Sequence, residues 1–560
     1  MLVAVFVVTA GLGAADPRSA AESTQRESRR RFQEQELTVS PATFLVTRDQ
    51  PPPRIIWRDV DEVRRLGGDG VLRVRWFDAE LNERNAPDKP GRWGAYVEGT
   101  APNGTPVRRA MTFYCRPPGF LFYLPAASPC PPPHQPGPID AAVWGEHRDE
   151  IAGAAAQSWF DALNRTEAGA ILIAGLTEST PLGRSPTATE TAAALNEDYH
   201  LRLKLKVLGL AGKTRPLAPP RPRRQGPAPV LRDGPACEAG MTKDARAAIE
   251  SVCEAWARES GEPFVALVAR HGVIVTHRAY GRDASGVDVS LDYRNCVFSI
   301  TKTLTAILFS QFVDQGLIDL DDSVAKVFPD FPDDPDRVPT FRQCLTHTSG
   351  LSGHGDWGGS TNPHFENIIL NGVDANEPGK AYAYSGAGFD LTAKAMEVVT
   401  GKSWRRIFRD HLFEPLGLGD VPMDNASAGA RLTAFELAAF GQWLSNRGSY
   451  GDREFITLAT SERLLPEQLG YRYHGVTAEE GIGMHWMNVP GPGPAAQPGH
   501  SPRTLLGPRT VGHGSLSGCT LLVDLERELV IVQVRRQAGP KYGEWLSRFV
   551  QAAVESSATH

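Results

Sequence analysis

The sequence predicts an α+β protein with two parts, on the basis of its apolar patterns and one proline-rich segment. Two apolar runs, 264–269 and 273–280, are separated by three turn-forming residues and are expected to pair as strands. Two further runs, 519–524 and 529–534, form a second expected hairpin near the carboxyl end. A helical pattern of apolar residues follows Ser299, and a proline-rich segment separates this region from the residues before it. A last helix is indicated by an apolar stripe at Trp545, Leu546, Phe549, Val550 and Ala553.

The proline-rich segment covers residues 213–235, where seven prolines alternate with five arginines. Proline fixes the backbone and removes a hydrogen-bond donor, so this stretch cannot continue a helix or a central strand. We therefore expect an extended, semi-rigid linker between a domain at 40–212 and a domain at 236–560. The basic charge suits contact with an anionic surface, but we adopt the plain linker interpretation.

The first 15 residues are apolar and end in small residues before Asp16, which is typical of a signal peptide whose basic start is missing. The alternative is a buried first strand, but the polar residues 16–38 separate this run from any core. The run is too short for a membrane span. We therefore expect a secreted or periplasmic protein with no integral membrane span.

Composition limits the classes of function. With 560 residues, two or three domains are expected, and a net charge of -6 gives no reason to expect a nucleic-acid partner. Export would permit disulfides among the seven cysteines, whose odd number leaves at least one free. The pairs nearest in sequence are Cys115 with Cys130 and Cys237 with Cys253.

The amino-terminal part is predicted to be a separate α+β domain. Its expected strands are 71–77, 95–100, 107–114, 120–124, 170–176 and the alternating apolar residues Leu201, Leu203, Leu205 and Val207. Asn103-Gly104 suits a tight turn, and a helix is expected around 147–163. No catalytic set of residues is visible here, so the partner of this domain is left open.

The strongest chemical signal is the tetrapeptide Ser299-Ile300-Thr301-Lys302. A serine hydroxyl needs a nearby base, and a lysine three residues further along a helix lies on the same face. Apolar residues follow at helical spacing and stop before Gly316, which predicts a buried helix with the serine in its first turn. The unpaired N–H groups of such a turn suit an oxyanion. The alternative is an ordinary N-capping serine beside a solvated lysine.

The order of the segments around this tetrapeptide favours the catalytic interpretation. After the serine helix come the segments 316–322, 345–351, 384–386, 413–418 and 513–515. In this set the chain resembles the penicillin-recognising serine hydrolases, which include class C β-lactamases, D,D-peptidases, D-aminopeptidases and related esterases. The resemblance covers about residues 236–560. It implies a β-lactamase-like fold, in which an antiparallel sheet is flanked by helices and early and late strands share that sheet.

The resemblance also implies roles for individual residues. Ser299 would be the nucleophile, Lys302 its base partner and Tyr384 a second acid/base group. The backbone N–H groups of Ser299 and Leu516 would form the oxyanion hole. His347 would have a structural role. The residues implied to line the substrate site are Gly386, His513, Gly514, Ser515 and Leu516.

Three positions depart from the pattern of that family. Gly386 has no side chain where Tyr-x-Asn or Tyr-x-Ser is usual, so a polar partner for an acyl amide is missing unless another residue replaces it. His513 stands where β-lactamases and peptidases usually have the lysine of Lys-Thr-Gly, which favours an esterase or an aminopeptidase. Ser515 replaces a glycine that lets substrate approach the strand, and its side chain is expected to narrow that approach.

From these residues we expect a serine hydrolase that forms an acyl-enzyme on Ser299 and cleaves a small ester, amide or peptide. One alternative is a β-lactamase or D,D-carboxypeptidase. Another is a non-catalytic binding protein, for which Gly386 and Ser515 are the motivation. No H-E-x-x-H, clustered C-x-x-C or calcium-loop motif occurs, so neither a metal nor another cofactor is expected.

Overall fold

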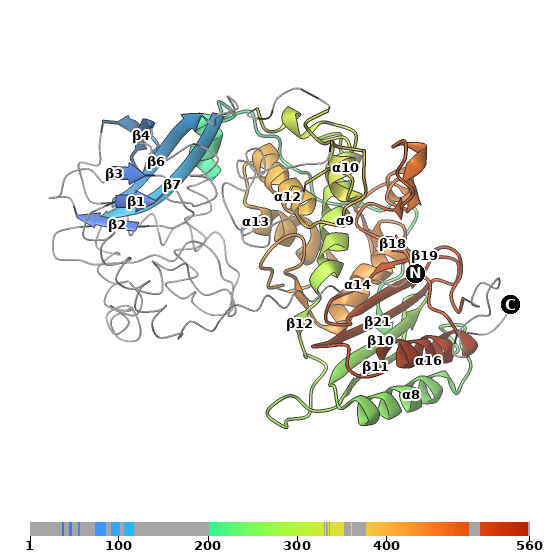
Figure 1. Ribbon diagram of the computed structural model, residues 1–560. Coiled ribbons are helices and arrows are strands. Elements are labelled where there is room, and N and C mark those ends of the chain that lie inside the picture. Colours follow the sequence, from blue (N-terminus) through green and yellow to red (C-terminus); the bar gives the residue numbers. More distant parts are fainter. Residues whose placement is uncertain are drawn as a thin grey trace. The chain divides into compact units, whose positions relative to one another are not determined.

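The computed structural model divides the chain into two compact units, Met1–Leu203 and Lys204–His560, which we describe separately (Figure 1). Before residue 201 the described residues are 36–38, 44–47, 54–56, 73–85, 91–100 and 106–116. Residues 201–557 are described except for 330, 332–333, 335, 352–359, 361–376, 420 and 492–503.

A seven-stranded sheet is the centre of the second unit. Its order is β18 (His485–Trp486), β19 (Thr510–His513), β20 (Thr520–Asp524), β21 (Leu529–Arg535), β10 (Phe264–Arg270), β11 (Val273–Tyr280) and β9 (Arg232–Asp233). Neighbours are antiparallel except β9, which runs parallel to β11. Both expected hairpins are confirmed, and β10 pairs with β21, so strands from the two ends of this unit share one sheet.

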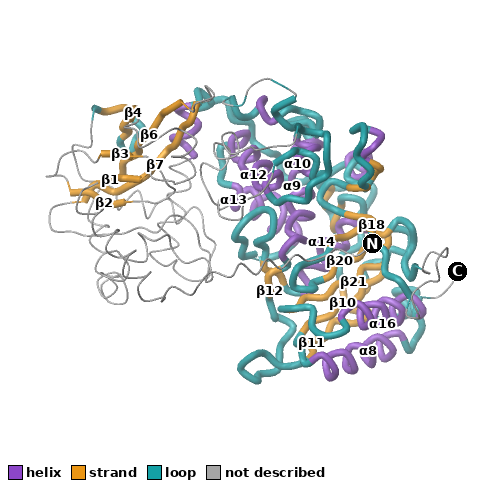
Figure 2. Tube along the Cα trace, viewed as in Figure 1, coloured by secondary structure: helices purple, strands orange, loops and turns teal. Residues whose placement is uncertain are grey.

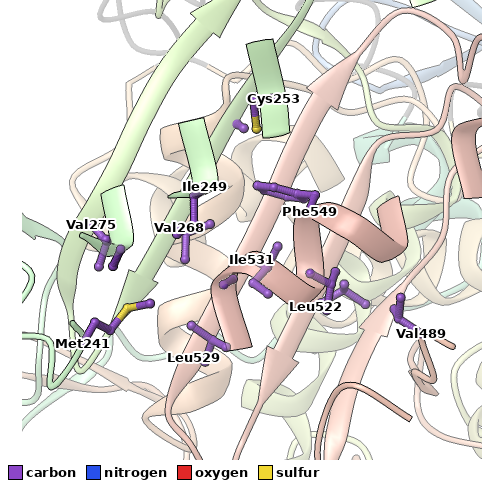
Figure 3. Packing of buried hydrophobic residues seen from close by; sticks show 14 of the residues in the cluster. Met241, Ile249, Cys253, Val268, Val275, Val489, Leu522, Leu529, Ile531 and Phe549 are labelled. Atoms are coloured by element: carbon purple, nitrogen blue, oxygen red, sulfur yellow. The ribbon is translucent and has the colours of Figure 1, made fainter. Parts of the chain in front are cut away.

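Helices cover both faces of this sheet, as the tube in Figure 2 shows. On one face, α8 (Ala245–Ser260) and α16 (Tyr542–Glu555) pack over the strands, and Figure 3 shows Ile249 and Phe549 among Leu522, Leu529 and Ile531. On the other face, α14 (Ala434–Ser445) contacts β20, β21 and β10. The apolar stripe predicted for the last helix is confirmed, because its residues are buried or partly buried in this core.

A second group of helices surrounds α9 (Thr301–Asp314), which is buried along its length from Thr301 to Val313. The 3₁₀ turn η1 (Phe298–Ile300) leads directly into α9. The buried helix predicted after Ser299 is therefore confirmed. Two of these helices, α12 (Ala387–Thr400) and α15 (Leu458–Glu462), contact α9, and α10 (Phe341–Leu345) and α13 (Trp404–Phe408) contact α12. The short strands of this unit are β8 (Arg221–Pro222), β12 (Asn295–Cys296), β13 (Arg431–Leu432), β14 (Ser449–Tyr450), β15 (Arg453–Glu454), β16 (Glu467–Gln468) and β17 (Glu479–Glu480).

The proline-rich segment 213–235, which we call the strap, differs from a free spacer. It is extended, as its prolines require, but it is bound to the second unit along its length. Its strand β8 pairs with β15, its strand β9 pairs with β11, and Ala228 bridges to Gly451. Arg221 also donates to the buried side chain of Asp314 at 2.9 Å. Regular pairing with distant strands satisfies the backbone groups that proline leaves available, and the sequence of the strap alone does not reveal those partners.

The first unit contains a five-stranded sheet in the order β2 (Phe44–Thr47), β7 (Pro106–Arg116), β6 (Gly91–Thr100), β4 (Arg73–Phe77) and β5 (Glu83–Arg84). A parallel pair, β1 (Glu36–Thr38) and β3 (Arg54–Ile56), stands apart from it. The strands predicted at 71–77, 95–100 and 107–114 are confirmed, and β6 pairs antiparallel with β7. The expected turn at 103–104 lies outside the described residues, as do the elements expected at 120–124, 147–163 and 170–176.

One secondary-structure prediction is wrong. Residues 201–207 are helical, whereas their alternating apolar residues predict a strand. Leucines at positions i, i+2 and i+4 fit either pattern, because the first and third of them also share one face of a helix. The predicted signal peptide lies outside the described residues and stays a prediction, as does the independent folding of the amino-terminal part.

The described residues also bear on the suggested disulfides and on the expected absence of a membrane span. Cys237 is exposed and Cys253 is buried in the core, and both are free, so they do not form the suggested pair. Cys296, Cys344 and Cys519 are also free thiols. No helix among the described residues is both long and apolar enough to cross a bilayer.

Candidate active site

The predicted nucleophile, Ser299, lies in the turn η1 at the start of the buried helix α9. Phe298, just before it, has a φ of 43°, a left-handed conformation that is uncommon for a bulky residue. Such backbone conformations persist only where the surrounding structure holds them, and they are frequent at functional sites. Strand β19, which ends at His513, contacts this turn. The fold therefore brings the third motif next to the serine.

Lys302 lies one helical turn after Ser299. Its Nζ donates to the Oγ of Ser299 at 3.4 Å and to the carbonyl of Ser427 at 2.9 Å. The side chain is only 3% exposed. Burial lowers the pKa of this amine from 10.5 to about 8, although the charge of Asp390 acts in the opposite direction. An amine with such a pKa can accept a proton from a neighbouring hydroxyl near neutral pH.

Tyr384 covers this amine from the solvent side. The Nζ of Lys302 lies 4.9 Å from the centre of the Tyr384 ring, and the tyrosine is half exposed. Partial burial raises the pKa of the phenol, whereas a hydrogen bond with Ser299 opposes that rise. The structure thus brings Ser299, Lys302 and Tyr384 together.

His513 is a neutral neighbour of this group. Its Nδ1 donates to the carbonyl of Gly514 at 2.7 Å, which leaves Nε2 as an acceptor 3.5 Å from the Tyr384 hydroxyl. Burial, together with the charges of His485 and Lys302, lowers the pKa of His513 to about 3. His513 therefore carries no charge at physiological pH.

The remaining residues of the third motif lie in the loop after β19. Ser515 is partly buried, and its hydroxyl is 2.8 Å from that of the buried Ser517, so this side chain is tied to its own loop. A Cβ at Gly514 would meet no atom within 4 Å, and the side chain of Leu516 is 82% exposed. The hydroxyl of Ser515 is thus held by its loop, and open space surrounds Gly514.

His347 packs against the ring of Tyr384. Its Nδ1 accepts from the backbone N–H of Ser385 at 3.1 Å, and its ring lies 4.2 Å from that of Tyr384, centre to centre. Burial and the charge of Lys302 hold the pKa of His347 well below its usual value. These contacts fit the structural role that the resemblance implies.

Sequence reasoning missed a buried carboxylate beside the site. Glu480 is 1% exposed, and it accepts from the Tyr382 hydroxyl at 2.8 Å and from Nδ1 of His485 at 2.9 Å. The ring of His485 lies 4.5 Å from that of His513. Tyr382 was detectable from its place two residues before Tyr384, but no motif marks the other two residues.

Sequence reasoning also missed a second pair, Ser427 and Asp390, which contacts Lys302 through the carbonyl of Ser427. The hydroxyl of Ser427 donates to the Oδ2 of Asp390 at 2.9 Å, and a Cβ added at Gly386 would approach that hydroxyl oxygen to 2.7 Å. Ser427 thus occupies the space that a side chain at position 386 would need. Among the described residues, no group of three or more His, Cys, Asp or Glu side chains has an arrangement suited to a metal ion.

Comparisons with known proteins match the carboxy-terminal part. The chain is 35% identical over 144 residues to penicillin-binding protein 4 of Amycolatopsis lactamdurans, which covers 24% of this chain and 37% of that protein. It is 30% identical over 179 residues to the D-alanyl-D-alanine-carboxypeptidase/endopeptidase AmpH of Escherichia coli K12, covering 29% of this chain and 46% of that protein. The chain thus spans less than half the length of these two curated relatives.

A solved structure of a penicillin-binding protein homologue from Caulobacter crescentus aligns with 56% of this chain and 98% of its own, at 21% identity and a TM-score of 0.47. The model of the beta-lactamase family matches residues 258–553, which is more than half of the 560 residues. The chain therefore belongs to the beta-lactamase family.

Proposed function

We propose that this protein hydrolyses small neutral esters through an acyl-enzyme on Ser299. The observation that supports this proposal most strongly is the buried Lys302 amine, 3.4 Å from the serine hydroxyl and with a pKa of about 8. At pH 7 such an amine is unprotonated in roughly one molecule in ten. It is therefore available as a base without a histidine.

In the proposed reaction, the Oγ of Ser299 attacks the ester carbonyl as its proton passes to Lys302. The backbone N–H groups of Ser299 and Leu516 stabilise the oxyanion. The carbon–oxygen bond to the alcohol then breaks, and the Tyr384 hydroxyl protonates the leaving oxygen and is reprotonated from Lys302. Water attacks the acyl-enzyme through the same groups in reverse order and releases the acid. No cofactor is required for these steps.

The charges around the site support neutral substrates. His513 is uncharged, with a pKa of about 3, and Glu480 places a buried carboxylate nearby. Neither group attracts the carboxylate of a penicillin or of a D-alanyl terminus, whereas a lysine in place of His513 would do so. Gly386 offers no side chain to an acyl amide. We therefore propose that esters are preferred over β-lactams and D-alanyl peptides.

D,D-carboxypeptidase or β-lactamase activity is the second candidate. The similarity to the carboxypeptidase/endopeptidase AmpH, 30% identity over 179 residues, favours it. The two candidates differ in whether the substrate carries a carboxylate beside the scissile bond.

The deciding experiment compares kcat/KM for p-nitrophenyl butyrate, nitrocefin and a D-alanyl-D-alanine peptide in wild type and Ser299→Ala. We expect the ester to be hydrolysed fastest and Ser299→Ala to lose all activity above background. A wild-type preference for nitrocefin or the peptide would overturn the ester proposal. Absence of turnover together with absence of fluorophosphonate labelling, measured by intact mass, would instead favour a binding protein.

The grouping of Ser299, Lys302 and Tyr384 is tested by combining substitutions. Each single alanine variant should lower kcat/KM by orders of magnitude, and a double variant should be scarcely worse than the singles, because members of one proton-transfer unit are not additive. Additive losses would contradict the shared role.

A further inference from the structure

A buried carboxyl group that the proposed reaction does not use lies beneath the site. Asp390, in the first turn of α12, is 5% exposed. Its Oδ2 accepts from the Ser427 hydroxyl at 2.9 Å, and its Oδ1 accepts from the backbone N–H of Ala426 at 3.2 Å. Burial of a charged carboxyl group costs free energy, so such a group normally has a partner that its charge stabilises.

Ser427 connects Asp390 to its partner, Lys302. While its hydroxyl contacts Asp390, its carbonyl accepts from the Nζ of Lys302 at 2.9 Å, which is shorter than the 3.4 Å contact between Lys302 and Ser299. The side chain of Asn425 fixes the same loop, because its Oδ1 accepts from the backbone N–H groups of Ser427 at 3.1 Å and Ala428 at 2.7 Å. Displacement of Ser427 would therefore displace the lysine amine.

Gly386 leaves the room that this arrangement needs. An added Cβ would lie 2.7 Å from the Oγ and 3.0 Å from the Cβ of Ser427, closer than side-chain atoms normally approach. The φ of Gly386 is -81°, so the backbone itself accepts any residue. Ser427, and not backbone strain, is what excludes a side chain here.

We propose that Asp390 and Ser427 form an anchor that positions the Lys302 amine against Ser299, and that Gly386 is required because the anchor occupies the space of its side chain. The inference rests on the proposed function in that Lys302 is taken as the base. Asp390 and Ser427 are positioning residues, since they act through Lys302.

Electrostatics make the proposal measurable. Burial raises the pKa of Asp390, and its hydrogen bonds with Ser427 and Ser360 and the charge of Lys302 oppose that rise. In its charged form Asp390 raises the pKa of Lys302 and partly offsets the effect of burial on the amine. The other titratable groups near this amine are Tyr384, His347 and His513. Burial lowers the pKa of both histidines below physiological pH, so they do not change charge there. Removal of the Asp390 charge should therefore lower the pKa of Lys302.

The first test is the pH profile of ester hydrolysis in Asp390→Asn. We expect the acidic limb of kcat/KM to move to lower pH, which loss of a purely structural contact would not cause. Asp314→Asn is the matched control, because Asp314 is a largely buried acid on α9, 12 residues from Lys302 and thus about 18 Å away along the helix. A limb at the wild-type pH in Asp390→Asn would overturn the proposal.

The second test is a cycle of Gly386→Ala and Ser427→Gly. Gly386→Ala should lower kcat/KM about 100-fold by displacing the amine, and Ser427→Gly should also lower it because the contact with Asp390 is lost. The double variant should be no worse than Ser427→Gly alone, because the added Cβ then meets no side chain at position 427. The melting temperatures of the variants should show the same non-additivity. A Gly386→Ala variant with wild-type activity, or a double variant in which the two losses add, would contradict the anchor.

A readout without turnover separates this inference from the proposed function. If wild type does not hydrolyse esters, the proposed function fails, and the pKa of Lys302 can still be measured by trace acetylation with acetic anhydride and peptide mass spectrometry. A lower pKa in Asp390→Asn than in wild type would support the anchor, and an unchanged value would overturn it.

Discussion

The pH dependence of ester hydrolysis should reveal the lowered pKa of the buried Lys302 amine. With a pKa of about 8, the unprotonated fraction rises from roughly 9% at pH 7 to roughly 91% at pH 9, so kcat/KM should increase about tenfold and then level off. A lysine with the ordinary pKa of 10.5 would be about 0.03% unprotonated at pH 7. Its rate would still be rising at pH 9, by almost a hundredfold over the same interval.

The assay follows p-nitrophenyl butyrate from pH 6 to 9.5, with Ser299→Ala as the blank for spontaneous hydrolysis. A midpoint near 6.5 would refute the reasoning, because it would indicate a histidine base. A steep rise without a plateau would refute the claim that burial perturbs the lysine. The histidines next to Tyr384 do not interfere, since the pKa of His513 is about 3 and that of His347 is well below its usual value.

Three other outcomes are expected. Lys302→Met should raise the free energy of unfolding at pH 7, measured in urea, by less than about 3 kcal/mol. The pKa of Lys302 is lower in the folded state, so the charged amine destabilises the fold most below pH 8, and this effect disappears as the pH rises towards 10.5. The gain is reduced because Asp390 loses its nearby cation in the variant. A destabilised variant would contradict this. His513→Lys should lower the ratio of kcat/KM for the ester to kcat/KM for nitrocefin. An unchanged ratio would contradict the proposal that the missing charge at position 513 disfavours carboxylate-bearing substrates. Phe549→Ala should lower the free energy of unfolding by about 3–5 kcal/mol. A loss below about 1 kcal/mol would contradict the tight packing of α16 on the sheet.

The predictable features of this protein are those set by local spacing. Ser299 and Lys302 are three residues apart where the turn η1 leads directly into α9, so local helical geometry brings them together. The hairpins follow from two apolar runs and a short turn. Residues 201–207 show the limit of this approach, because a short apolar run does not distinguish a helix from a strand.

The other parts of the candidate site depend on long-range contacts. Ser427 is 125 residues from Lys302 and 37 from Asp390, and no periodicity or motif relates these positions. The absence of a side chain at Gly386 was visible, but the residue that occupies its place was not. The buried Glu480 was equally hidden, because its partners Tyr382 and His485 come from separate segments.

The strap has a practical consequence for any shortened form of the protein. Its strand β9 is the outermost strand of the large sheet and pairs with Val273 and Ile274 of β11. A chain that starts at residue 236 would leave these backbone groups unpaired beside an apolar surface, and it would also lose the buried Leu217 and Leu231. Unprotected edges of this kind recruit further strands and promote self-association. A fragment meant to stay monodisperse should therefore begin ahead of the strap.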